Sequence, residues 1–113
     1  MKIPEDGCLL RIFIGESDRW HGRPLYEVIV LKARELRLAG ATVLRGPMGF
    51  GANSRLHTAK ILRLSEDLPM IIEIVDAQEK IDALLPFIDE AVREGLVTLE
   101  QVKVIKYRSN EKS

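Results

Sequence analysis

Residues 8–14 read Cys-Leu-Leu-Arg-Ile-Phe-Ile and end at Gly15, and this run decides the architecture of the chain. Its density of aliphatic and β-branched residues predicts a β-strand. Alternation along a strand places Leu10, Ile12 and Ile14 on one face. Because the opposite face is also largely apolar, we expect helices to cover one side of this strand and another subunit to cover the other.

A helix is predicted over 24–39. Pro24 suits its first turn, since the N–H that proline lacks would be unbonded there, and Gly40 is placed to end it with a left-handed cap. Residues at helical spacing form the predicted buried face: Leu25, Ile29, Ala33 and Leu36. Leu31 and Leu38 fall near the charged face, where they are either ordinary exposed leucines or contacts for a partner.

Two further strands are predicted at 41–45 and 70–75, and Pro69 marks the start of the second. Asp76 and Glu79 have the spacing of a capping box, in which the Asp76 side chain accepts a hydrogen bond from the first helical turn. A second helix is therefore expected to begin at this point.

The second helix has an apolar face made of Ile81, Leu84, Leu85, Ile88 and Val92. Pro86 removes one backbone hydrogen bond within it, which predicts a kink facing solvent or a break. Gly95 lies where a C-terminal cap is wanted. We expect a connecting loop at 96–101 and the last strand at 102–107.

The element order is therefore β-α-β-β-α-β, which predicts an α+β fold of the ferredoxin-like sandwich type. In this fold both helices cover one face of a four-stranded antiparallel sheet. The other face would remain largely apolar, and burial between subunits is the simplest way to cover it. We expect one domain over 1–113, with loose ends at 1–7 and 108–113.

Composition limits the classes of function. The 113 residues include 17 basic and 17 acidic side chains, so no overall charge attracts nucleic acid. Cys8 is the single cysteine, which excludes an intramolecular disulfide and a cysteine-based zinc site, and we expect it to be buried. The charged N-terminus lacks the apolar core of a signal peptide, and no apolar run is long enough to span a membrane, so we expect a cytoplasmic protein.

The connection between the second and third strands is rich in glycine. Residues 45–60 read Arg-Gly-Pro-Met-Gly-Phe-Gly-Ala-Asn-Ser-Arg-Leu-His-Thr-Ala-Lys. Glycines let backbone N–H groups approach an anion, and Arg45, Arg55 and Lys60 add cationic donors suited to phosphate. The spacing matches neither a Walker loop nor a Rossmann fingerprint. Residue types alone fit an anion-binding loop and a flexible hairpin equally well. His57 is a further candidate for phosphate contact or proton supply, although a lone surface histidine usually serves neither purpose.

The polar segment 18–23, Asp-Arg-Trp-His-Gly-Arg, is a second candidate contact. Trp20 is suited to stack on a nucleobase or, more commonly, to form a hydrophobic lid packed on the first helix. His21 has no second metal ligand at meaningful spacing, so we predict no metal site.

Several of these motifs resemble those of the PII signalling superfamily. The resemblance rests on residues 40–43 (Gly-Ala-Thr-Val), 49–51 (Gly-Phe-Gly) and 68–76 (Leu-Pro to Asp), with one extra residue before Gly49. The run 15–26, from Gly-Glu-Ser-Asp-Arg-Trp to Pro-Leu-Tyr, is more specifically similar to the PII-like group known as domain of unknown function 190.

This resemblance implies a homotrimer with nucleotide clefts between subunits and a mobile loop that reports the bound ligand. It places residues 49–51 at the base of that loop. We assign ligand binding to nine residues: Trp20, Arg45, Gly46, Gly49, Phe50, Gly51, Ser54, Arg55 and His57.

Departures from the PII pattern narrow the expected ligand. Residues 93–101 lack the Gly-Asp-Gly-Lys phosphate cradle of PII, and 107–109 lack its Arg-x-Arg pair. We therefore expect AMP or ADP rather than ATP, and no required cofactor. No catalytic arrangement is recognisable, so we predict a regulatory protein and not an enzyme. The alternative is a trimeric binding module that docks on a membrane channel or transporter without nucleotide control.

Overall fold

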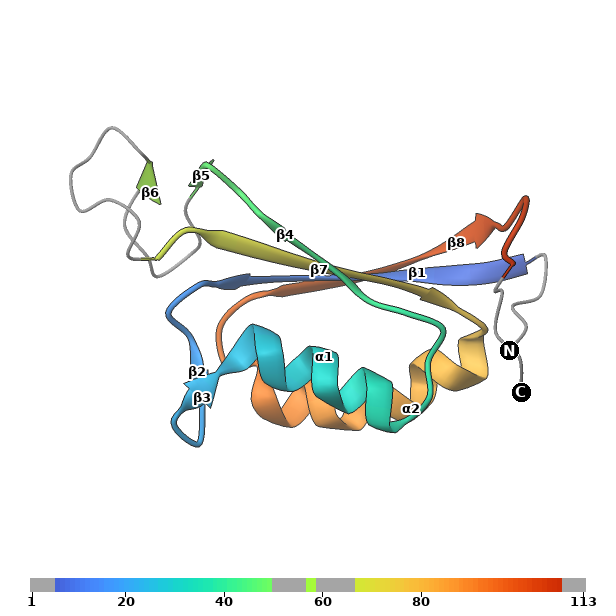
Figure 1. Cartoon of the computed structure of the whole chain (residues 1–113), viewed down its shortest axis with the longest axis horizontal. Helices are drawn as coiled ribbons and strands as arrows, with labels where there is room; N and C mark the ends of the chain where they lie inside the picture. Colours follow the sequence, from blue (N-terminus) through green and yellow to red (C-terminus); the bar gives the residue numbers. More distant parts are fainter. Residues whose placement is uncertain (1–5, 50–56, 59–66, 109–113) are drawn as a thin grey trace.

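The computed structural model describes residues 6–49, 57–58 and 67–108. Its main elements in chain order are β1 (Asp6–Gly15), α1 (Leu25–Glu35), β4 (Thr42–Arg45), β7 (Pro69–Asp76), α2 (Gln78–Ala91) and β8 (Leu96–Lys103). The four strands pair antiparallel in the order β4-β7-β1-β8, and both helices lie on one face of the sheet (Figure 1). The predicted ferredoxin-like α+β fold is confirmed.

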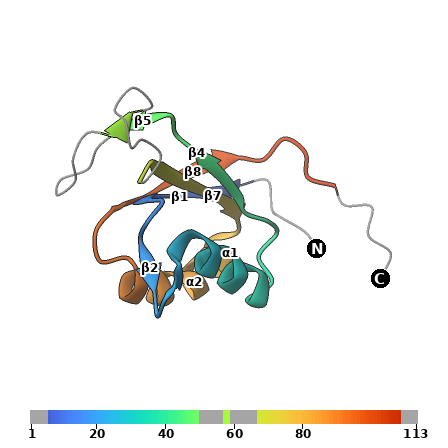
Figure 2. The same ribbon diagram turned by 60° about the vertical axis from the view of Figure 1, so that its left-hand side comes forward.

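Two short hairpins extend from one end of this sheet. The first joins β2 (Arg19–Trp20) to β3 (Arg23–Pro24), and the second joins β5 (Met48–Gly49) to β6 (His57–Thr58). The β2–β3 hairpin lies on the helix side of the sheet, whereas β5 and β6 lie on the opposite side (Figures 1 and 2). Among the described residues, no helix is long and apolar enough to cross a membrane.

The core lies between the sheet and the helices. β1 and β7 form the centre of the sheet, with pairing that runs from Cys8 opposite Asp76 to Gly15 opposite Pro69. Alternate residues of both strands point at the helices and are fully buried: Leu10, Ile12, Ile72 and Ile74. The helices contribute Leu25, Ile29, Ala33, Ile81, Leu84 and Ile88 at the helical spacing that the sequence predicted. Cys8 is buried as expected, and its Sγ lies 3.1 Å from Gln78 Oε1.

The end of α1 differs from the prediction. The helix stops at Glu35, and Arg37, not Gly40, adopts the left-handed backbone conformation with a φ of 64°. The predicted glycine cap at Gly40 is therefore wrong. The early reversal turns Leu38 into the core, where it is buried, so its interpretation as a surface leucine is also wrong. Leu31 is exposed.

The start of α2 also differs, because the N-cap residue is Ala77 and not Asp76. The Asp76 carboxylate is buried and accepts hydrogen bonds from the backbone N–H groups of Ala39 at 2.8 Å and Ala77 at 2.7 Å. Asp76 thereby ties the chain after α1 to the start of α2, and the predicted capping box is not formed. Pro86 is exposed within α2 and does not break it.

The last strand lies earlier in the chain than predicted. β8 spans Leu96–Lys103, whereas the sequence predicted a loop at 96–101 and a strand at 102–107. Gly95 does not cap the helix, which ends at Ala91; it begins the approach to β1, where an added Cβ would lie 2.6 Å from the carbonyl oxygen of Phe13. β8 is an edge strand, and nearly all of its residues are exposed. Its residues therefore do not alternate between buried and exposed as those of the inner strands do.

Replacing Asp76 tests the buried tie between the two helix connections. We expect Asp76→Ala to lower the free energy of unfolding by about 2–4 kcal/mol, because two backbone donors lose their acceptor. Asp89→Ala, at an exposed position of α2, is the matched control and should change stability by less than about 0.5 kcal/mol. Equal effects of the two substitutions in chemical denaturation would contradict this role of Asp76.

Candidate functional site

The glycine-rich connection leaves and re-enters the sheet through two paired arms. Arg45 at the end of β4 lies opposite Met70 of β7, and the N–H of Gly46 donates to the carbonyl of Pro69 at 2.8 Å. Farther out, Gly49 lies opposite His57 in the β5–β6 ladder. The backbone therefore brings together Gly49 and His57, two residues that the sequence predicted as ligand contacts.

A tight turn after β1, residues 15–18, holds the returning arm. The N–H of Glu16 donates to the carbonyl of Leu68 at 2.8 Å, and the N–H of Ser17 donates to Asp67 Oδ1 at 2.9 Å. Within the turn, the N–H of Gly15 donates to Asp18 Oδ2 at 3.0 Å. We call the turn 15–18, the arm residues 45–46 and the arm residues 67–69 together the loop base.

Close backbone packing explains the glycines of the loop base. A Cβ at Gly15 would overlap the Asp67 carboxylate, and one at Gly46 would lie 3.3 Å from Pro69 Cγ. Neither glycine has a left-handed backbone. Glycine therefore suits both positions because the facing chain segment leaves little room for a side chain, and not because the turn requires a positive φ.

An ion pair joins the outgoing arm to the turn. A guanidinium nitrogen of Arg45 lies 3.1 Å from Glu16 Oε1, and the two side chains are 49% and 25% exposed. Glu16 Oε1 itself is buried and accepts no hydrogen bond from a described residue, so the contact is close but not aligned as a hydrogen bond. Arg45 therefore retains donors that face solvent.

Carboxylates gather around the turn and shift the pKa of one of them. Burial raises the pKa of Asp18 above its ordinary value, the hydrogen bond from Gly15 opposes this, and the charges of Asp67 and Glu94 raise it further. Across the described part of the chain, no group of three or more acidic, histidine or cysteine side chains has an arrangement that could hold a metal ion.

The remaining predicted contacts divide into two groups. Phe50, Gly51, Ser54 and Arg55 lie outside the described residues, so their assignments remain predictions. Trp20 lies in the β2–β3 hairpin, stacked on His21 with ring centroids 4.3 Å apart and edge-on to Phe87 of α2 at 5.7 Å. This packing has the form expected of a lid: β2 lies against α1, as predicted, and the Trp20 ring also contacts α2 through Phe87. A role for Trp20 in ligand binding remains a prediction.

The sheet face without helices carries a row of apolar side chains. Leu44, Ile71, Phe13 and Leu96 lie opposite one another across all four strands. We call these four residues the apolar row. Leu44 and Leu96 are exposed, and the row lies at the end of the sheet nearest the loop base.

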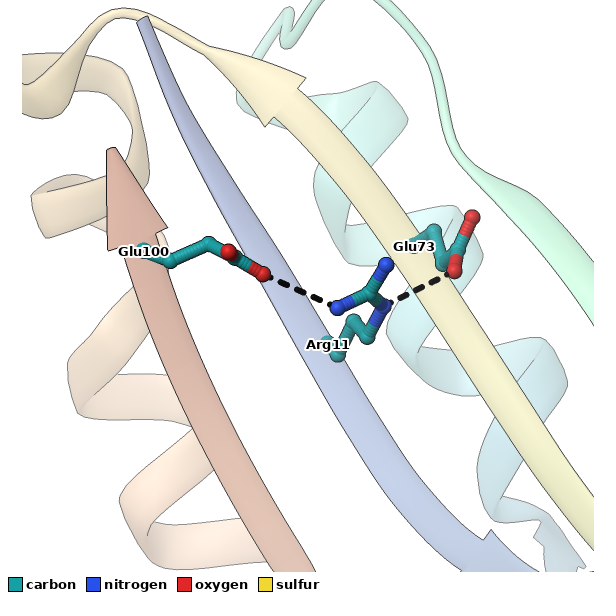
Figure 3. Close-up of polar contacts among 3 residues, drawn as sticks. All are labelled: Arg11, Glu73 and Glu100. Carbon is teal, nitrogen blue, oxygen red and sulfur yellow. Dashed lines mark hydrogen bonds and ion pairs between the residues drawn. The ribbon is translucent and has the colours of Figure 1, made fainter. Parts of the chain in front are cut away.

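Charged residues lie beside the apolar row on the same face. Arg11 pairs with Glu73 at 3.0 Å and with Glu100 at 2.9 Å, so one cation of β1 bridges its two neighbouring strands (Figure 3). The hydrogen bond to Glu73 is the main cause that raises the pKa of Arg11 above its ordinary value, so Arg11 stays charged.

Sequence reasoning missed the acidic half of the loop base. Glu16 and Asp67 received no role, and Asp18 was considered only as part of the candidate segment 18–23, although residues 15–18 form a conspicuous Gly-Glu-Ser-Asp run directly after a predicted strand. That run signals a turn. Its partners lie about 50 residues away, as in the bond from Ser17 to Asp67, and no local pattern reveals them.

Comparison with solved structures defines the class of the fold. The chain is similar to CPII, a nitrogen regulatory PII-like protein from Thiomonas intermedia K12 whose structure is bound to ADP, AMP and bicarbonate. The TM-score is 0.65 with 16% sequence identity, over 89% of this chain and 90% of CPII. The fold is therefore PII-like.

Comparison with protein families identifies the group more closely. Residues 7–104 match the model of DUF190, described as "Uncharacterized ACR, COG1993". A UPF0166 protein of Aquifex aeolicus (strain VF5) is 40% identical over 97 residues, which cover 86% of this chain and 91% of the relative. A UPF0166 protein of Methanocaldococcus jannaschii is 34% identical over 104 residues, covering 91% and 95% respectively. The chain belongs to the DUF190 family.

The shifted pKa of Asp18 predicts a measurable pH dependence. Because the folded protein binds this proton more tightly than the unfolded chain does, stability decreases as the pH rises above the ordinary value of 3.8. Asp18→Asn mimics the protonated form and escapes this loss. We expect the variant and the wild type to have similar stability below about pH 3, and the variant to gain relative to the wild type toward neutral pH.

Chemical denaturation of both proteins across this pH range measures the difference. Asp89→Asn, at an exposed position, controls for the general loss of one negative charge. A difference between Asp18→Asn and wild type that does not change with pH would contradict the assignment.

Proposed function

We propose that this protein is a non-catalytic regulator that binds AMP or ADP at the loop base, in clefts between the subunits of a homotrimer. The observation that carries the proposal is the half-exposed guanidinium of Arg45, held beside the paired arms of the glycine-rich connection. Arginine presents several N–H donors that suit phosphate oxygens. CPII, which has the same fold, is bound to ADP and AMP in its structure, and this supports the choice of ligand.

The connection between α2 and β8 supports a small nucleotide over ATP. α2 ends at Ala91 and β8 begins at Leu96, so only residues 92–95 join them. Such a short connection has little room for a cradle around a triphosphate. The phosphate of AMP or ADP would instead be held by cations of the glycine-rich connection, with Arg45 as the described member.

A regulatory role without catalysis fits the nucleophiles and bases that the structure describes. Cys8 is buried against Gln78, far from the loop base along β1. His21 lies exposed at the hairpin turn with its ring stacked on Trp20. Neither side chain is paired in the way that an activated nucleophile requires.

The apolar row supports the proposed assembly. A row of four large apolar side chains across the sheet face that no described helix covers is costly to leave in water. Packing against the same face of neighbouring subunits would bury it. Because the row lies at the same end of the sheet as the loop base, assembly would also bring a neighbouring subunit close to Arg45.

Removing the charge of Arg45 tests the nucleotide site. We expect AMP and ADP to bind the wild-type protein, and Arg45→Gln to weaken that binding about tenfold or more, because a charge-assisted hydrogen bond to phosphate is lost. Isothermal titration calorimetry measures both affinities. Arg34→Gln, which removes an exposed arginine of α1, is the matched control and should leave the affinity unchanged.

Two outcomes would reject this site. The first is an absence of heat and of thermal shift with millimolar AMP, ADP or ATP, which would favour the alternative of a binding module that docks on a membrane protein. The second is an equal loss of affinity in Arg34→Gln and Arg45→Gln, which would assign the effect to overall charge.

The apolar row predicts which leucine controls assembly. Leu44 in the row and Leu31 on α1 are both 46% exposed, so they form a matched pair. We expect Leu44→Glu to convert the trimer to monomers and Leu31→Glu to leave it intact, since only the first places a charge on the proposed interface. Multi-angle light scattering gives the masses. A monomeric wild type, or an intact trimer of Leu44→Glu, would contradict the proposed interface.

A further inference from the structure

We infer that Glu16 is a built-in competitor of the ligand: its carboxylate occupies Arg45 in the free protein, and a phosphate group must displace it to bind. This inference rests on the proposed nucleotide site. Glu16 lies in the turn after β1 and is not one of the proposed ligand contacts. The inference gives it a regulatory role.

The geometry of the ion pair makes it exchangeable. Arg45 and Glu16 are 3.1 Å apart, yet Glu16 Oε1 accepts no hydrogen bond from a described residue. The pair is therefore held by charge and not by an aligned hydrogen bond. A phosphate group is also negatively charged, and it can accept aligned hydrogen bonds from the Arg45 guanidinium. It would therefore bind Arg45 more strongly than the Glu16 carboxylate does. Since Arg45 is half exposed, its side chain can turn toward such a ligand without unpacking the core.

The backbone of Glu16, in contrast, is held in place. Its N–H donates to the carbonyl of Leu68 at 2.8 Å, and the next residue, Ser17, is bonded to Asp67. When Arg45 turns away, these bonds keep the backbone of Glu16 where it is, and a buried carboxylate oxygen loses its one described cation. The free protein therefore favours the closed ion pair, and the cost of opening it lowers the affinity for any anion.

The exchange also changes how the glycine-rich connection is held. The Glu16–Arg45 pair ties the turn to the outgoing arm, whereas the bonds of Glu16 and Ser17 tie it to the returning arm. A ligand that takes Arg45 removes the first tie and leaves the others in place. Occupancy of the site is thereby linked to the attachment of one arm, which is the kind of differential contact that a ligand-driven switch needs.

Glu16→Gln in the full chain tests the competition. Glutamine keeps the size of the side chain and removes its charge, so Arg45 becomes free for the ligand. We expect the variant to bind AMP about three to ten times more tightly than the wild type, the range set by a partly exposed ion pair. In an Arg45→Gln background the same substitution should leave the affinity unchanged, because the competition requires both side chains. Glu27→Gln, an exposed glutamate of α1, is the control and should have no effect.

The outcomes separate the inference from the proposed function. If Arg45→Gln weakens AMP binding and Glu16→Gln does not strengthen it, Glu16 is not a competitor while the nucleotide site stands. If neither wild type nor Glu16→Gln binds AMP or ADP, both proposals fail. Should Glu16→Gln not fold, Glu16→Asp withdraws the carboxylate by one methylene and is expected to tighten AMP binding in the same direction; unchanged affinity in that variant would equally overturn the inference.

Discussion

The antiparallel pairing of β1 with β7 is the constraint on which the other features of this fold depend. It runs in one register from Cys8 opposite Asp76 to Gly15 opposite Pro69. At one end of the pair, Asp76 lies next to the connection after α1. At the other end, the turn 15–18 lies next to the returning arm of the glycine-rich connection. A slip by one residue would turn the buried face of one strand to the opposite side of the sheet, so the burial of pairs such as Leu10 and Ile74 also fixes the position of the loop base.

The fold could be predicted because its signals are local and periodic. Alternation in residues 8–14 and helical spacing from Leu25 to Ala33 both correspond to real burial. The errors occurred where tertiary contacts decide the outcome. α1 ends early, at a left-handed turn that carries Leu38 into the core, and β8 begins early, where Gly95 lets the chain approach β1. Neither contact can be predicted from the neighbouring sequence.

Only one part of the candidate site could be predicted from the sequence. Its cationic and glycine-rich part stands out in the sequence, since Arg45, Gly46 and Gly49 follow one another closely. Its acidic part does not, because Glu16 contacts Arg45 only in the folded chain, where the turn after β1 lies beside the end of β4. When a loop is interpreted from its residue types alone, the residues that stand out are those that could attract a ligand. The groups that contact those residues, such as Glu16, come from elsewhere in the chain and become visible only in the folded protein.

The first and last residues of the sheet have a consequence for how this protein could be joined to others. Asp6 lies opposite Lys103, so β1 enters and β8 leaves the sheet side by side, at the end remote from Arg45 and Gly46. A domain fused before β1 or after β8 would therefore be carried on the side of the molecule away from the loop base. A reporter or an effector attached at either point would therefore leave the loop base unobstructed.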